Sequence, residues 1–145
     1  MKKIFSALFF LLIANLPVFA NDENKIDPKV IAAFQKEFSF AENAKWEAKG
    51  DLSQVNFSMN NQGFVAWYNE DAELLSTARN LLYMQLPLSA IRTLERDYSD
   101  ADLSGFIEIT RNGETYYQLQ AERKGKKFIL KATPSGNVTV SKRLK

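Results

Sequence analysis

Hydrophobic residues along the chain follow first a helical period and then a period of two. Four of them define one predicted helical face, namely Val30, Ile31, Phe34 and Phe38. They follow Asp27-Pro28, an N-cap residue and a proline at the first helical position. Apolar and polar residues then alternate over 55–59, and a returning run covers 64–68 after a turn. The pattern predicts a helix beginning at Pro28, followed by a half-buried β-hairpin.

The same order of elements returns about 60 residues later. A second helical stripe is formed by Ala90, Ile91, Leu94 and Tyr98. We therefore predict an α+β fold of two tandem repeats, each with one helix followed by about four antiparallel strands. Repeat one covers about 28–84 and repeat two about 87–142. A unit of this size is marginal alone, so the halves are expected to share a core or a sheet, with Phe34 and Leu94 buried at equivalent places.

Short motifs carry a resemblance to a known family. Phe38-Ser39-Phe40-Ala41 is followed by Trp46, and Leu86-Pro87 precedes the second helix. In this order the chain resembles the PepSY-like, beta-lactamase-inhibitor-like proteins of Gram-negative envelopes, over residues 28 to about 142. The resemblance rests on core positions and turns, so it implies a fold, and no inhibitory residue of that inhibitor is matched here. Asp71-Ala72 departs from the Asp-Gly that similar proteins have at this turn.

The first twenty residues have the three parts of a secretory signal peptide. Lys2 and Lys3 provide the positive charge, residues 4–16 are apolar, and Val18-Phe19-Ala20 forms the cleavage signal. The alternative is a retained membrane anchor, but the apolar stretch is shorter than the roughly 20 residues that a spanning helix needs. We predict a signal peptide at 1–20, one domain at 21–145, and a periplasmic or secreted protein with no membrane span after cleavage.

Charge is balanced overall but not along the sequence. Without the two lysines of the signal peptide, 17 basic residues stand against 17 acidic ones. Residues 123–145 hold eight basic residues and no acidic one. This run is typical either of a surface for an anionic partner or of a solvated strand face with a charged tail. The near-neutral domain favours the second interpretation and argues against nucleic acid as a partner.

Two residue types that carry much of enzyme chemistry are missing. The chain has no cysteine and no histidine. The lack of cysteine excludes disulfides, so the core alone must stabilise an exported domain. The lack of histidine excludes Ser-His-Asp and Cys-His sites and makes a zinc site improbable. We therefore predict a protein that is not an enzyme and that has no cofactor and no metal.

Acidic residues leave two weaker possibilities. Carboxylates can perform acid-base chemistry without histidine, and the candidates are Glu42, Glu47, Glu95 and Asp97. Each lies on a polar helix face or in a bend, where a solvated side chain is the ordinary interpretation. The alternation of Asn69, Asp71 and Glu73 resembles a calcium loop, but the glycine and the final glutamate of such a loop are absent, which favours a plain turn.

The candidate binding residues are Trp67, Val65 and Tyr116. If Phe64, Ala66 and Tyr68 face the helix, alternation places Val65 and Trp67 on the opposite sheet face, and Tyr116 lies there by the same rule. Aromatic residues on a polar sheet face are typical of protein-binding surfaces, so Trp67 is expected to be exposed. The alternative is that this face packs against the other repeat or against residues 81–86.

Three function hypotheses follow. The first is a non-catalytic exported envelope protein, a module that binds a protein or peptide of undefined identity with its helix-free sheet face. The second is a small-molecule or ion-binding accessory protein of the periplasm that uses a cleft between the repeats. The third is a weak hydrolase built on carboxylates, which the missing catalytic motifs disfavour.

Overall fold

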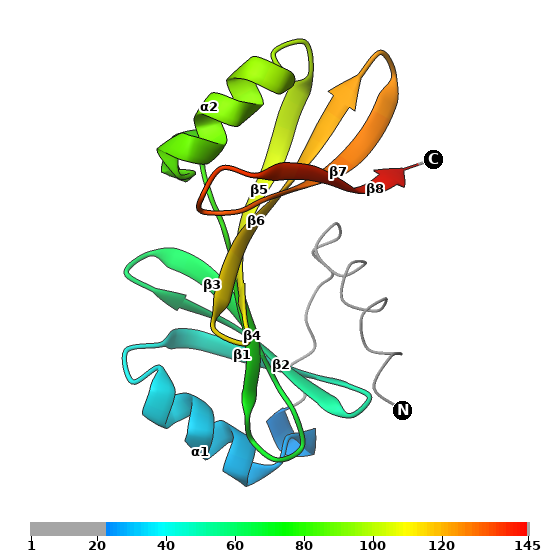
Figure 1. Ribbon diagram of the computed structural model, residues 1–145. Helices are drawn as coiled ribbons and strands as arrows, with labels where there is room; N and C mark the ends of the chain where they lie inside the picture. The colour runs from blue at the N-terminus through cyan, green and yellow to red at the C-terminus, as the bar shows by residue number, and fades with distance from the viewer. Residues whose placement is uncertain (1–22, 145) are drawn as a thin grey trace.

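The computed structural model describes residues 23–144, so the predicted signal peptide lies outside the described residues. Within these residues, two α-helices, two short 3-10 helices (labelled η) and eight strands follow one another in a simple order (Figure 1). In chain order the elements are η2 (Glu23–Lys25), α1 (Pro28–Glu37), β1 (Glu42–Lys49), β2 (Leu52–Met59), β3 (Gln62–Tyr68), β4 (Leu74–Asn80), η3 (Tyr83–Gln85), α2 (Leu88–Asp97), β5 (Asp102–Arg111), β6 (Glu114–Arg123), β7 (Lys126–Ala132) and β8 (Val138–Leu144). Within this part of the chain, no helix is long and apolar enough to cross a membrane.

All eight strands belong to a single antiparallel sheet in the order in which they occur in the chain. The prediction of two tandem repeats, each a helix with its own set of about four strands, is wrong, because β4 pairs directly with β5 and the sheet is continuous. The α+β class and the expectation of a shared sheet are confirmed. Pairing between β4 and β5 runs from Ser76↔Arg111 to Asn80↔Ile107, which makes the middle of the sheet as regular as its ends.

Helix α1 begins where the sequence predicts. The Asp27 side chain accepts a hydrogen bond from the Lys29 backbone N–H at 2.9 Å, and Pro28 occupies the first turn. This cap satisfies one of the N–H groups that a helix start leaves without an intrahelical partner. Helix α2 instead begins after Pro87, without a side-chain cap, and the Ser89 hydroxyl donates to the Pro134 carbonyl oxygen in the β7–β8 turn at 2.6 Å. The second helix is therefore held at its start by the sheet.

Both helices lie on one side of the sheet, which we call the helix face (Figure 1). They cover two separate apolar clusters there. Under α1 lie mainly aromatic side chains, with the Phe34 ring edge-on to Trp46 and to Phe57 at centroid distances of 5.3 and 5.0 Å. Under α2 the cluster is mainly aliphatic and includes Leu94 and Leu119. The predicted burial of Phe34 and Leu94 is confirmed.

Between these clusters the helix face is polar. One row of cross-strand neighbours runs across it through Phe57, Phe64, Arg79, Glu108, Tyr117 and Ala132. The guanidinium of Arg79 donates to the carboxylate of Glu108 twice, at 2.7 and 3.2 Å, in the bidentate geometry that favours such pairs. The middle strands β4 and β5 therefore present an ion pair where the outer strands present apolar side chains.

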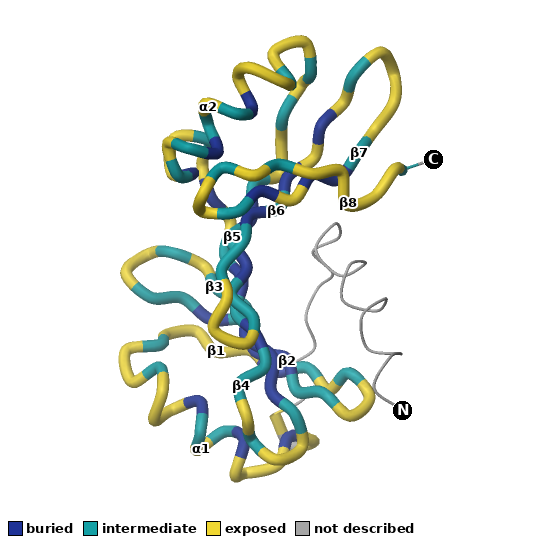
Figure 2. The backbone as a smooth tube through the Cα atoms, in the orientation of Figure 1, coloured by how far each residue is buried: buried dark blue, intermediate teal, exposed yellow. Residues whose placement is uncertain are grey.

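The opposite side, the helix-free face, shows the reverse pattern. Its middle strands carry the central cluster, defined here as buried Trp67, Ala78, Ile107 and Ile109 with half-buried Val65 and Tyr116. Buried positions accordingly continue through the middle of the sheet, as the dark blue segments in Figure 2 show. On β4 and β5 the charged residues Arg79 and Glu108 therefore lie on the helix face, and the apolar residues Ala78 and Ile109 lie on the helix-free face. This is the reverse of the neighbouring strands, which we call the inverted polarity of β4 and β5.

Candidate functional site

The three predicted binding residues lie together on the helix-free face. Val65, Trp67 and Tyr116 belong to the central cluster, as alternation along β3 and β6 requires. The predicted exposure of Trp67 is wrong, since only 5% of its surface is accessible. Val65 and Tyr116 are half-buried.

Trp67 is buried because its neighbours on β4 are small. Its direct partner is Ser76, and Ala78 lies two residues further along the same strand. These short side chains leave room for the indole above β4, and the isoleucines of β5, Ile107 and Ile109, complete the contact. Sequence alternation identifies the face of a side chain but not the size of the residues on the neighbouring strand, so it missed this burial.

A pocket of about 360 Å³ opens beside Trp67 at the edge of the central cluster. We call it the Trp67 pocket. Its walls come from the β1–β2 turn, the β3–β4 turn and the ends of four strands, β2, β3, β4 and β5. The lining residues are Asp51, Leu52, Trp67, Asn69, Glu70, Asp71, Leu75, Ser76 and Arg111. The pocket is therefore lined by three carboxylates, one guanidinium and several apolar side chains.

A β-bulge brings two consecutive residues of β4 to the pocket. Trp67 pairs with Ser76 and Tyr68 pairs with Leu74, so Leu75 is an extra residue on β4. In a regular strand Leu75 and Ser76 point to opposite faces, whereas here both line the Trp67 pocket. Such bulges re-aim side chains and recur beside functional sites. The sequence contains no turn residue that marks this bulge.

The β3–β4 turn is fixed by the Asn69 side chain. Its Oδ1 accepts hydrogen bonds from the Asp71 and Glu73 backbone N–H groups at 3.0 and 2.9 Å, and its Nδ2 donates to Glu73 Oε2 at 2.7 Å. This network confirms the plain-turn interpretation of Asn69, Asp71 and Glu73. Ala72 has a φ of +63°, so the chain keeps the left-handed conformation that glycine adopts more easily.

Two buried polar groups lie next to Trp67 without a hydrogen-bond partner. Ser76 is 3% exposed and Gln54 is 5% exposed, and Ser76 Oγ and Gln54 Oε1 both lack a partner. Gln54 and Ser76 pair with Trp67 from its two sides, through β2 and β4. Buried polar atoms are nearly always hydrogen-bonded, so these two unpaired oxygen atoms are unusual in a folded protein.

Tyr116 stands at the other side of the central cluster. The Lys131 ammonium lies over its ring, 4.2 Å from the centroid, which is a cation–π contact. Burial raises the pKa of the Tyr116 phenol, and the positive charge of Arg111 opposes that rise. The phenol therefore stays protonated and remains a hydrogen-bond donor near neutral pH.

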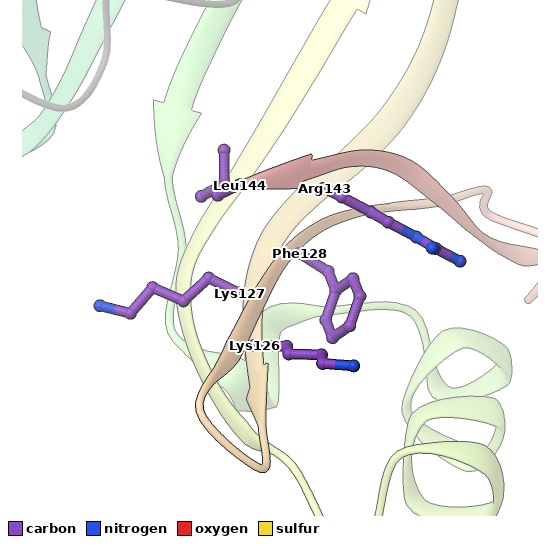
Figure 3. A pocket seen from close by; sticks show the side chains of 5 residues that line it. All are labelled: Lys126, Lys127, Phe128, Arg143 and Leu144. Carbon is purple, nitrogen blue, oxygen red and sulfur yellow. The ribbon is translucent and has the colours of Figure 1, made fainter.

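The basic C-terminal run forms a second, different pocket. Lys126, Lys127, Phe128, Arg143 and Leu144 line it at the β7–β8 edge, and Figure 3 shows Lys127 pointing to the opposite side of the strand from Phe128. Lys127 forms an ion pair with Glu122 at 3.6 Å. The interpretation of this run as a solvated strand face stays a prediction, since surface lysines alone do not define a site.

The carboxylates considered for acid-base chemistry do not come together. Glu47 pairs with Lys49 on β1, and Asp97 receives two hydrogen bonds from Arg96 beside it on α2. Arg96 lowers the pKa of the Asp97 carboxyl through these hydrogen bonds, which opposes a role as proton donor. Glu42 begins β1 and Glu95 lies on the exposed side of α2. Among residues 23–144, no three histidine, cysteine or acidic side chains are grouped as metal ligands.

A single eight-stranded antiparallel sheet with both helices on one face is a fold shared with several solved proteins. A BLIP-like protein from Bacteroides fragilis is similar with a TM-score of 0.74 at 21% identity, over 85% of this chain and 92% of that one. A DUF2874 family protein from Bacteroides uniformis is similar with a TM-score of 0.72 at 14% identity, over 82% and 88% of the two chains.

A third similar structure, from Bacteroides eggerthii, is described as a candidate periplasmic protein. Its TM-score is 0.70 at 17% identity, over 81% of this chain and 87% of that one. No protein-family model and no curated protein sequence matches the chain significantly. The structural likeness confirms the beta-lactamase-inhibitor-like fold, and the PepSY-like part of the resemblance stays a prediction.

Proposed function

We propose that the chain is a non-catalytic, exported envelope protein that binds a protein or peptide with its helix-free face. The binding surface consists of the central cluster and the Trp67 pocket, with Tyr116 and Val65 as its half-buried contact residues. The observation that carries the proposal is the inverted polarity of β4 and β5. These strands place an ion pair on the helix face, between the two helix-covered clusters, and apolar side chains on the face that neither helix covers.

Two further observations support this proposal. The predicted signal peptide and the similar structure described as a candidate periplasmic protein favour export. The BLIP-like neighbour favours a binding role for this fold over a catalytic one. A binding role is also favoured because the chain lacks histidine and cysteine and because the four candidate carboxylates are dispersed over β1 and α2.

The test is affinity capture from the cell envelope with paired variants. Tyr116→Ala removes a half-buried contact on the helix-free face, whereas Leu88→Ala removes an exposed apolar side chain from α2. We expect Tyr116→Ala to weaken capture by about 2 kcal/mol, the scale of an aromatic hot spot, and Leu88→Ala to leave it unchanged. Equal effects of the two changes, or capture that depends only on Leu88, contradict the proposal.

A second candidate function is a small-molecule accessory protein, and the Trp67 pocket favours it. Its volume of about 360 Å³ lies within the range of ligand pockets. A stable small-molecule complex raises the melting temperature of the protein in the absence of any protein partner. Such a rise with envelope metabolites, together with no captured protein, supports this second function over the first.

A further inference from the structure

We infer that the Trp67 pocket receives the cationic side chain of a lysine or arginine from the bound peptide. This inference rests on the proposed function, because it specifies what the helix-free face recognises. Three properties of the pocket carry it: its charge, its apolar and aromatic wall, and its position.

The charge of the pocket favours a cation. Asp51, Glu70 and Asp71 contribute three carboxylates, against the single guanidinium of Arg111. The acidic residues come from two different turns, β1–β2 and β3–β4, that the sheet brings to one opening. A ligand with a positive group is attracted by this arrangement, and a ligand with a carboxylate is repelled.

The wall of the pocket suits the long side chain of a basic residue. Leu52 and Leu75 can contact its methylene groups, and the accessible 5% of Trp67 adds part of an indole, the aromatic group that attracts cations most strongly. A simple metal ion uses none of these apolar contacts. The pocket therefore matches an ammonium or guanidinium group at the end of an aliphatic chain.

The position of the pocket favours a peptide over a free amine. Trp67 belongs both to the pocket and to the central cluster, so the pocket is continuous with the helix-free face. A basic side chain can enter the pocket while neighbouring residues of the same peptide contact Val65 and Tyr116. A free amine makes only the first set of contacts.

The test uses the protein purified from the envelope and the indole N–H resonances of its two tryptophans. The probes are acetyl-Ala-Lys-Ala-amide, its glutamate and norleucine counterparts, and n-butylammonium. We expect the lysine peptide to shift the Trp67 resonance in a saturable way and to leave Trp46, which is buried under α1, unchanged. The glutamate peptide and norleucine peptide should bind at least tenfold more weakly, and n-butylammonium more weakly than the lysine peptide.

Charge-neutral variants link the binding to the pocket. Changing both Asp51→Asn and Asp71→Asn should weaken the lysine peptide about fivefold, the scale of one or two solvent-exposed ion pairs. The matched control Glu37→Gln removes an exposed carboxylate from α1 on the helix face and should have no effect. Because all three residues are exposed, neither variant is expected to prevent folding.

Several results overturn the inference. These are an unchanged Trp67 resonance, equal binding of the norleucine peptide, stronger binding of the glutamate peptide, equal binding of n-butylammonium, or no effect of the double variant. Envelope capture with the double variant separates this inference from the proposed function. Capture that survives the double change but is lost with Tyr116→Ala overturns only the cationic pocket, whereas capture that survives both overturns the binding face as well.

Discussion

The two faces of the sheet bury apolar side chains by different means. On the helix face, α1 and α2 cover the clusters that contain Phe34 and Leu94, and the polar outer sides of the helices meet the solvent. On the helix-free face, Trp67 is buried to a similar extent although neither α1 nor α2 covers it, and it packs among residues of the sheet. The comparison shows that the same degree of burial arises in two ways, under a helix for Phe34 and Leu94 and among neighbouring strands of the sheet for Trp67.

The largest expected effect tests whether the central cluster stabilises the fold as the helix-covered clusters do. We expect Phe34→Ala and Trp67→Ala each to lower the free energy of unfolding by about 3–5 kcal/mol, because both remove a buried aromatic side chain. Urea denaturation monitored by circular dichroism measures both changes. A loss below about 1 kcal/mol for Trp67→Ala contradicts the burial described here.

A second effect concerns the β7–β8 turn, which packs against α2. Gly136 has a φ of +90°, and a Cβ atom at this position lies 2.7 Å from the Ser89 carbonyl oxygen. Gly136→Ala should therefore destabilise the protein by at least about 2 kcal/mol, from left-handed strain and from the clash with the helix. A melting temperature equal to that of the unmodified protein contradicts this contact.

The β3–β4 turn offers the opposite experiment, because it has an alanine, Ala72, where the β7–β8 turn has a glycine. Its hydrogen bonds resemble those of the β7–β8 turn, with Ala72 N–H donating to Asn69 O and Gly136 N–H donating to Thr133 O. Ala72 is left-handed without the freedom of glycine, so Ala72→Gly should raise stability by about 1 kcal/mol. Thermal denaturation measures this change, and a decrease in stability shows that the methyl group makes contacts that outweigh the strain.

The smallest expected effect concerns the buried Ser76 hydroxyl and tests whether this group stabilises the fold. Ser76→Ala removes a buried hydroxyl that has no partner, so stability should stay unchanged or rise by up to about 1 kcal/mol. Ser58→Ala is the control, since the Ser58 hydroxyl donates to the Glu42 carbonyl oxygen at 3.3 Å and accepts from Asn43 Nδ2 at 3.2 Å. Chemical denaturation of the two variants compares them, and a large loss for Ser76→Ala indicates that its hydroxyl has a structural role.

Much of the fold follows from local patterns in the sequence. Asp27-Pro28 marks the start of α1, alternation identifies β2 and β3, and Asn69 identifies the turn between β3 and β4. Each of these signals depends on residues that are close in the chain. They were sufficient to place Val65 and Trp67 on the face away from the helices.

What the sequence did not predict depends on contacts between distant strands. The sequence predicted that the halves share a core or a sheet, but the pairing of β4 with β5 that makes one continuous sheet has no local signal in it. The burial of Trp67 depends on the small size of Ser76 and Ala78 on the next strand, and the pocket depends on the bulge at Leu75. Tertiary pairing of this kind has no local sequence signal.

The most direct test of the binding face is site-specific photo-crosslinking in the cell envelope. A benzophenone amino acid placed at position 116 lies on the helix-free face, and the same amino acid at position 88 lies on the exposed side of α2. We predict a discrete crosslinked protein from position 116 and none from position 88. Crosslinking from position 88 alone, or from neither position, contradicts a binding role for the helix-free face.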